Sequence, residues 1–303
     1  MTEALVQLKT ALTEKNINFT ENEPMGSHTT FLVGGAASLF IEPSTEAEIA
    51  AVQAAARTHG VPLFCLGRGS NLLVSDEGLP FAVLHLGEAF SGVKQLSETT
   101  LEVRSGTKLS TLCTAAVKLG LSGLEFAYGI PGTVGGGIYM NAGAYGGELC
   151  SAIRSVTFLD DMGTVRTLER EALDFGYRHS YFSNKGCIIL SALFQLTPGD
   201  KNAIQAAMDD YMSRRRDKQP LEYGSAGSTF KRPAGAFAGA LIEQCGLKGF
   251  TVGGAQVSEK HAGFVINRKN ATAADVMAVM AHVQATVKAE TGYTLEPEIL
   301  ILP

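Results

Sequence analysis

Two glycine-rich stretches are the clearest candidates for binding a ligand through the backbone. GRGSNL covers residues 67–72, and GIPGTVGGGIYMNAGAYGGE covers residues 129–148 with eight glycines and one charged residue, Glu148. Glycine lets the backbone approach a ligand closely, and successive N–H groups bind phosphate without a cationic side chain. Both stretches therefore predict a phosphate or pyrophosphate site, although tight packing would give the longer stretch the same composition.

Neither stretch fits the two best-known nucleotide motifs. The pattern GxxxxGK[ST] is absent from the chain, which argues against a P-loop kinase or ATPase. GRGSNL has Leu72 where the dinucleotide fingerprint requires glycine, and it leads into LLVSDEG rather than into a helix. Two separate backbone-rich loops indicate one long ligand held between two lobes, and FAD has a suitable length.

Composition excludes several classes of protein. The net charge of −5 argues against a general binder of nucleic acid or of anionic membranes. No apolar run is long enough to span a bilayer and no signal peptide is recognisable, so we expect a cytoplasmic protein. The five cysteines are scattered, which indicates reduced thiols, and no cluster has metal-ligand spacing, so we expect no metal.

Apolar periodicity predicts alternating helices and strands over a chain long enough for two or three subdomains. Thr2 is expected to cap the first helix, and Ser44 to cap a second helix that ends at Gly60. Further helices are expected at 108–119, 202–216, 237–246 and 272–291. Strands are expected at 29–43, 61–67, 81–87, 186–196, 261–267 and 295–302, with hairpins at 91–106 and 155–168.

Five motifs occur in a fixed order along nearly the whole chain: GRGSNLLVSDEG, GIPGTVGGGIYMNAGAYG, YRHSYF, SAGSTFKRP and LEPEI. In this order they resemble the UDP-N-acetylenolpyruvoylglucosamine reductases, flavoenzymes that make UDP-N-acetylmuramate for bacterial peptidoglycan and so for cell-wall growth, cell shape and division. No single motif carries the resemblance. YRHSYFSNKGCIIL runs almost directly into a strand, which is similar to the shorter branch of that family, without the tyrosine loop that closes on the uridine.

The resemblance implies an α+β fold with a two-lobed FAD-binding domain of the vanillyl-alcohol-oxidase type and a C-terminal substrate-binding domain. We expect residues 1–87 with 294–303 to form the first lobe, 88–200 the second lobe and 201–293 the substrate domain. The cofactor would be FAD, bound non-covalently because no histidine or cysteine stands in a tethering context, and NADPH would be the reductant. We expect a monomer that binds a nucleotide sugar and no nucleic acid or membrane.

The implied reaction reduces a vinyl ether that bears a carboxylate, with hydride passing from NADPH through FAD. Arg178 matches the arginine that would bind the carboxylate in a bidentate manner. Ser228 matches the proton donor, and Glu298 matches the third catalytic position, where it would be protonated or paired. From the residues alone, a surface arginine, a turn serine and an edge-strand glutamate are the commoner readings, and Glu296 is the rival of Glu298.

The remaining site residues also follow from the motifs. Tyr177 and the cations Lys231, Arg232 and Lys260 are expected to contact the substrate, the cations at its diphosphate. The basic run RRRDKQP (214–220) is better explained as a helix C-terminus. The cofactor contacts expected from the two glycine-rich stretches are Gly67, Arg68, Gly69, Ser70, Asn71, Leu72, Gly129, Pro131, Gly132, Thr133, Gly136, Asn141 and Ala142.

Two other functions compete with this one. A sugar or aldonolactone oxidase on the same flavin fold would oxidise an alcohol and would need a base to remove a hydroxyl proton. A regulatory nucleotide-binding module would bind a phosphate ligand without turnover. The oxidase would be yellow and would react with oxygen, whereas the module would be colourless.

Overall fold

The computed structural model describes residues 1–303, and the chain folds into two compact units. The first unit consists of Met1–Thr20, Leu39–Arg68 and Phe81–Arg214, and the second of Glu21–Ser38, Gly69–Pro80 and Arg215–Pro303. Each unit draws on distant parts of the sequence. No helix is both long enough and apolar enough to span a membrane.

A five-stranded antiparallel sheet forms the centre of the first unit, in the order β12-β11-β13-β7-β6. The central strand is apolar on both faces, because Ile189 packs into one hydrophobic cluster and Leu190 into another. Both hairpins expected from the sequence are confirmed. The strands are β6 (Val93–Gln95), β7 (Thr100–Arg104), β11 (Ile153–Leu159), β12 (Val165–Glu169) and β13 (Ile188–Gln195).

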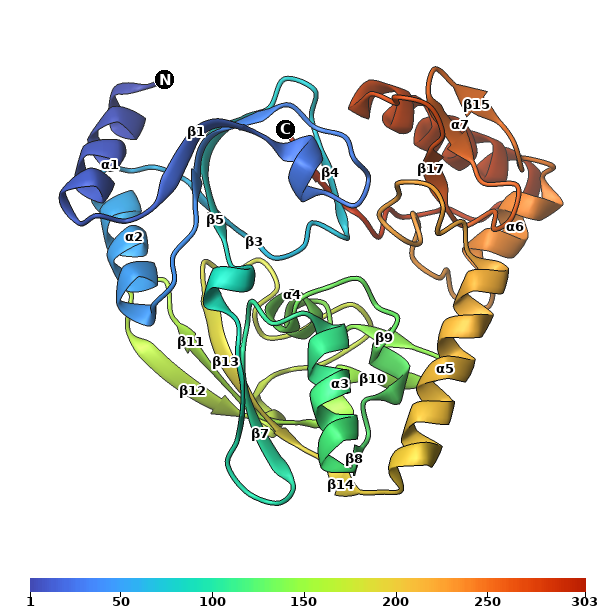
Figure 1. Cartoon of the computed structure of the whole chain (residues 1–303). Helices are drawn as coiled ribbons and strands as arrows, with labels where there is room; N and C mark the ends of the chain where they lie inside the picture. The colour runs from blue at the N-terminus through green and yellow to red at the C-terminus, as the bar shows by residue number, and fades with distance from the viewer. The chain divides into compact units, whose positions relative to one another are not determined.

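Helices contribute to the hydrophobic clusters on both sides of this sheet (Figure 1). The helices α3 (Leu109–Leu119) and α4 (Val134–Tyr139) pack in the cluster that contains Ile189, and α1 (Glu3–Glu14) and α2 (Glu46–Thr58) pack in the cluster that contains Leu190. The expected cap of α1 is confirmed, since the Thr2 side chain accepts from the N–H of Leu5. The expected cap of α2 is wrong by one residue, because Thr45 rather than Ser44 accepts from the helix.

A second sheet has the order β1-β2-β5-β3, with β3 and β5 parallel. The strand expected at 29–43 is shorter than predicted, because residues before Ala36 take irregular conformations that include positive φ at Leu32 and Gly34. The strands are β1 (Phe19–Pro24), β2 (Ala36–Ile41), β3 (Leu63–Leu66) and β5 (Leu79–His85).

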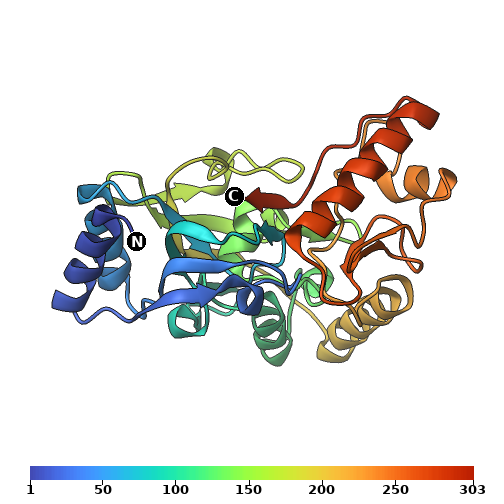
Figure 2. The same cartoon turned by 90° about the horizontal axis from the view of Figure 1, so that it is seen from above.

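The second unit is built around helix α7 (Ala273–Thr291), whose buried stripe confirms the predicted amphipathic helix. After α7 the chain runs to the C-terminal strand, seen as the red arrow in Figure 2. That strand pairs in parallel with β4, which confirms that it returns to an earlier part of the chain. The other elements here are α6 (Ala238–Gln244), β4 (Leu72–Val74), β15 (Thr251–Val252), β16 (Ala255–Val257), β17 (Val265–Asn267) and β18 (Leu300–Leu302).

One long helix and several short elements complete the fold. Helix α5 (Lys201–Lys218) confirms the helix expected from residue 202, and Gly120 ends α3 with a φ of 71°. The short strands are β8 (Leu121–Ser122), β9 (Gly143–Ala144), β10 (Gly147–Glu148) and β14 (Thr197–Pro198). The 3₁₀ helices are η1 (Met25–His28), η2 (Glu88–Phe90), η3 (Glu125–Ala127), η4 (Leu149–Ser151) and η5 (Arg170–Ala172).

Candidate functional site

The loop at residues 67–71 has unbonded backbone N–H groups, as anion-binding loops do. The N–H groups of Gly67 and Arg68 donate no hydrogen bond within the first unit, and those of residues 69–71 donate none within the second. Side chains are excluded at two points, because a Cβ on Gly69 would lie 2.1 Å from the carbonyl oxygen of His28, and a Cβ on Gly67 would lie 2.3 Å from Oγ1 of Thr133. The exposed Arg68 adds a cation to the same loop. The loop therefore suits the pyrophosphate of a dinucleotide.

In the longer glycine-rich stretch, part of the backbone is used for internal hydrogen bonds rather than left open to a ligand. At the start of α4 the backbone N–H groups of Val134 and Gly135 donate to the carbonyl oxygens of Thr107 and Ser105, both at 2.8 Å, so they are not free for a phosphate. Glycine is required at 135 and 137 by close packing, since a Cβ would lie 2.9 Å from Cβ of Ser105 or 2.6 Å from Cδ1 of Leu149. The expectation that the start of α4 offers free N–H groups to a phosphate is therefore wrong.

The same helix leaves one open face beside the shorter loop. A Cβ on Gly136 would meet nothing nearer than Oγ1 of Thr133, 3.6 Å away. Thr133 caps α4, with Oγ1 accepting from the N–H of Gly136, and the same hydroxyl group lies against Gly67. The structure therefore brings together Gly67 and Thr133, one from each predicted cofactor stretch. The contacts of these residues with a cofactor stay predictions.

The other predicted cofactor residues have structural partners as well. Asn141 is buried, and its Oδ1 accepts from the N–H of Cys150 while its Nδ2 donates to Oε2 of Glu148 and to the carbonyl oxygen of Gly176. Leu72 lies buried in β4. Gly129, Pro131, Gly132 and Ala142 lie outside the regular elements, and Ser70 begins the turn before β4.

Tyr177 and Arg178 occupy the tip of a tight turn in the first unit. The N–H of Gly176 donates to the carbonyl oxygen of His179 at 3.0 Å, and the N–H of His179 donates to the carbonyl oxygen of Gly176 at 3.2 Å. Arg178 has a φ of 54°, a conformation that usually selects glycine or asparagine, and its guanidinium lies 5.1 Å from the Tyr177 ring centroid. Asn141 holds this turn through the Gly176 carbonyl. A strained, half-buried arginine beside an exposed tyrosine suits recognition of an anionic ligand.

Ser228 and Glu298 belong to the second unit, on two segments that pair with each other. The N–H of Glu298 donates to the carbonyl oxygen of Thr229 at 2.9 Å, and Phe230 and Pro297 form an antiparallel bridge. The Thr229 side chain is buried and accepts from the N–H of Val265, so the residue next to Ser228 is fixed from two directions. Ser228 itself is exposed, as a proton donor to a ligand must be.

The two candidate glutamates differ in their surroundings. Glu296 is exposed and pairs with Nζ of Lys231 at 3.4 Å. Glu298 is half-buried, and its backbone is held from both sides, since its carbonyl oxygen accepts from Nδ2 of Asn71 at 3.1 Å. These contacts favour Glu298 as the functional residue, because its backbone is held in place and its carboxylate is not the one paired with Lys231.

The three predicted diphosphate cations each have a partner within the second unit. Lys231 pairs with Glu296, the guanidinium of Arg232 lies 4.3 Å from the Phe237 ring centroid, and Nζ of Lys260 donates to the carbonyl oxygen of Arg216 at 2.6 Å. Their contact with a substrate stays a prediction. In the basic run, Arg214 forms an ion pair with Asp210 one helical turn earlier, as expected for a helix C-terminus.

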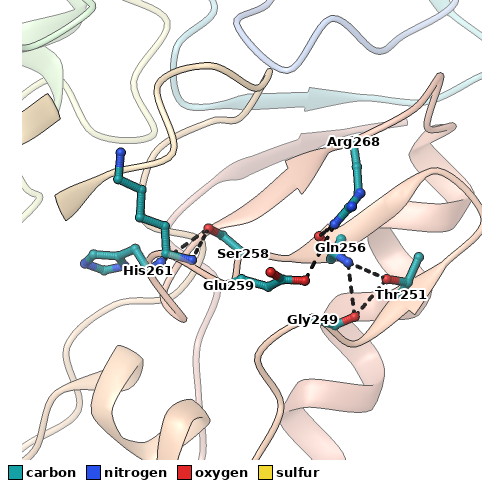
Figure 3. A network of polar contacts seen from close by, with 8 residues as sticks. Gly249, Thr251, Gln256, Ser258, Glu259, His261 and Arg268 are labelled. Atoms are coloured by element: carbon teal, nitrogen blue, oxygen red, sulfur yellow. Dashed lines mark hydrogen bonds and ion pairs between the residues drawn. The ribbon is translucent and has the colours of Figure 1, made fainter. Parts of the chain in front are cut away.

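A polar network fixes the loop that carries Lys260 (Figure 3). The hydroxyl of Ser258 accepts from the N–H groups of Lys260 and His261, at 3.1 and 3.2 Å. In the same network the buried Gln256 accepts from Arg268 at 2.7 Å. Burial lowers the pKa of His261, so its imidazole stays neutral near pH 7. The loop is therefore rigid, with its cation at the surface.

Sequence reasoning missed the residues that connect these segments. Asn71 was expected to contact the cofactor, but its bond to the Glu298 backbone was not foreseen. The carboxylate of Asp76, which was not predicted at all, accepts from the N–H groups of Ala273 and Ala274, at 2.8 and 3.0 Å, at the start of α7. An Asp after a strand in the sequence SDEG is a signal for a capping residue, but the distance along the chain hides the helix it caps. No group of three His, Cys, Asp or Glu side chains is arranged to hold a metal ion.

Comparison with known proteins decides the family. The model of an FAD binding domain matches residues 37–169, and the model of the UDP-N-acetylenolpyruvoylglucosamine reductase C-terminal domain matches residues 219–302. The reductase of Heliobacterium modesticaldum is 45% identical over 93% of this chain and 90% of its own length. The chain belongs to the UDP-N-acetylenolpyruvoylglucosamine reductase family.

Further members of the family agree with this assignment. The reductase of Clostridioides difficile is 44% identical over 93% of this chain and 92% of its own length. The crystal structure of the reductase from Thermus caldophilus superposes with a TM-score of 0.80 at 35% identity, covering 95% of this chain and 99% of that one. The expected fold, a flavin-binding part followed by a C-terminal reductase domain, is thereby confirmed.

Proposed function

We propose that this reductase converts the enolpyruvyl group of UDP-N-acetylglucosamine enolpyruvate into the lactyl group of UDP-N-acetylmuramate, with FAD as cofactor and NADPH as reductant, in peptidoglycan precursor synthesis. The observation that carries the proposal is the match to family members over nearly their whole length. The arginine turn, the serine segment and the glutamate segment are all present in this chain. An oxidase on the same fold has less support.

Bound FAD would pass hydride from NADPH to the enolpyruvyl group. The protein would then have to accommodate negative charge that spreads into the substrate carboxylate. We assign this task to Arg178, because a guanidinium stays charged at any working pH and binds a carboxylate through two parallel hydrogen bonds. The two-residue turn fixes the Arg178 backbone, so little conformational freedom would be lost on binding.

Protonation of the substrate carbon is assigned to Ser228. A hydroxyl is a weak acid, but a carbanion-like centre is a much stronger base, so the transfer is downhill. Ser228 is exposed, and Thr229 and Phe230 anchor its segment. Glu298 is assigned to the same reaction as a hydrogen-bond donor or charge partner, with its backbone held by Asn71 and Thr229.

We further propose that residues 67–72 and the surface around Thr133 and Gly136 bind FAD without a covalent link. Tyr177, Lys231, Arg232 and Lys260 would bind the substrate. The domain limits expected from the sequence, the cytoplasmic location and the monomeric state belong to the same proposal.

The visible spectrum of the purified protein tests the function. Under anaerobic conditions a yellow protein should bleach with NADPH and regain its colour with UDP-N-acetylglucosamine enolpyruvate. Reoxidation by oxygen alone would leave the flavin assignment standing and refute the substrate. A protein that stays colourless after incubation with FAD would refute the proposal as a whole.

Glu298→Gln and Glu296→Gln form a matched pair on one segment. The first should lower kcat by about a hundredfold or more, as loss of a group acting in the transition state does. The second removes a surface ion pair and should leave kcat within about twofold. Equal losses in the two variants would contradict the assignment of Glu298.

A further inference from the structure

Tyr145, an exposed residue of the longer glycine-rich stretch, stacks on the half-buried Tyr211 of α5. The rings of Tyr145 and Tyr211 are 4.7 Å apart between centroids and inclined by 11°. Tyr145 is 41% exposed, so a large part of this residue is accessible to a ligand. Arg214, one turn along α5 from Tyr211, adds a guanidinium 5.9 Å from the Tyr211 ring centroid. None of the residue assignments made above uses this pair.

The backbone at Tyr145 takes a conformation that is uncommon for tyrosine. Tyr145 and Gly146 form the two-residue loop between β9 and β10, with φ values of 53° and 87°. This is the φ pattern of a type I′ turn, whose first position favours Asn, Asp or Gly. A tyrosine there costs stability, and such outliers gather at binding sites.

The hairpin that carries Tyr145 is rigid. A Cβ on Gly147 would lie 2.4 Å from Cδ1 of Phe126, so the hairpin lies directly on that buried ring. Glu148 in β10 bonds to Nδ2 of Asn141, and the same amide group holds the turn of Arg178 through the Gly176 carbonyl. The tyrosine pair and the proposed carboxylate-binding turn are therefore fixed to one framework.

We infer that Tyr145, supported from behind by Tyr211, stacks on the heterocyclic base of a nucleotide ligand. A planar, exposed aromatic ring offers a base a large contact at a small cost in conformational entropy. A guanidinium beside the stack suits the phosphates that accompany the base. The inference rests on the proposed function, which supplies two nucleotides with such bases: the uracil of the substrate and the adenine of NADPH.

The test compares Tyr145→Asn with Tyr145→Phe. Asparagine suits the turn better than tyrosine, so the melting temperature should stay within about 3 °C of the wild type while the stack is lost. Loss of one stacking contact should raise KM by about tenfold for the nucleotide whose base is bound. Phenylalanine keeps the ring and should restore KM. Tyr211→Leu should show a smaller rise, and Met162→Asn, at another hairpin tip, should change nothing.

Binding of UDP and of NADP⁺, followed by calorimetry, gives a readout that is independent of turnover. A weaker Kd for UDP alone identifies uracil as the partner, a weaker Kd for NADP⁺ alone identifies adenine, and weaker binding of both shows a shared platform. If Tyr145→Asn binds both ligands as the wild type does, or only loses stability, the pair merely fastens α5 and the inference is overturned. Wild-type turnover with NADPH and the enolpyruvyl nucleotide separately tests the proposed function.

Discussion

Replacing Gly67 by alanine should damage the first unit through a single atom contact, and a second substitution should repair it. The new Cβ would lie 2.3 Å from Oγ1 of Thr133 but 3.5 Å from Cβ and Cγ2 of the same residue. The Thr133 hydroxyl cannot rotate away freely, because Thr133 is buried and caps α4. Overpacking of this kind costs about 1–3 kcal/mol.

Thr133→Ala removes the offending oxygen. By itself it loses a helix cap, and because the hydrogen bond to Gly136 is long, at 3.4 Å, the cost should be near the lower end of about 0.5–2 kcal/mol. In this background the Cβ at residue 67 finds only ordinary van der Waals contacts, so Gly67→Ala should cost almost nothing more. The double variant is therefore expected to be as stable as Thr133→Ala, and more stable than Gly67→Ala.

Urea unfolding of the apoprotein measures this cycle. The chain has no tryptophan, so circular dichroism is the appropriate probe. Gly92→Ala is the control, because its Cβ would meet nothing nearer than Cδ of Arg104 at 3.7 Å. Additive losses in the double variant would refute the steric reasoning. FAD retention, read from the ratio of visible to ultraviolet absorbance, then reports whether repair of the contact also restores the cofactor loop.

Three further predictions follow from single sites. Gly136→Ala should stabilise apo α4 by up to about 1 kcal/mol, because alanine is the better helix former. It should also weaken FAD binding, because the open face of Gly136 is the proposed cofactor surface. An unchanged Kd for FAD would show that Gly136 does not belong to the cofactor site. The hydrogen bond from Arg166 holds the pKa of Asp160 below its usual 3.8, so its stabilisation is present above about pH 4 and lost as pH falls through the folded pKa. Acid titration should therefore show Asp160→Asn less stable than the wild type at pH 7, with the difference shrinking as the pH falls below about 4, and a difference that stays constant in acid would contradict this. Asp76→Ala should destabilise the second unit by about 1–2 kcal/mol, because α7 loses a carboxylate at its N-terminus. Asp76→Asn should have a smaller effect. Equal stability of the wild type and both variants would show that the cap is dispensable.

The sequence by itself determined most of the longer helices, both hairpins of the five-stranded sheet, and the family. Hydrophobic spacing and end signals are local properties, so the stripe of α7, the glycine that ends α3 and both sheet hairpins were predictable. Motif order along the chain was sufficient to identify the reductase family. The shift of the α2 cap from Ser44 to Thr45 shows the limit, since neighbouring hydroxyl residues carry the same local signal.

Only the tertiary structure decided what individual residues contact. The glycines of α4 suggested free N–H groups, but Thr107 and Ser105 bond to the first N–H groups of that helix, and neighbouring side chains leave no space for a Cβ at 135 and 137. Asn71 holds the backbone of Glu298 across 227 positions of sequence. Such contacts arise when the chain folds back on itself, and no local pattern of residue types encodes them.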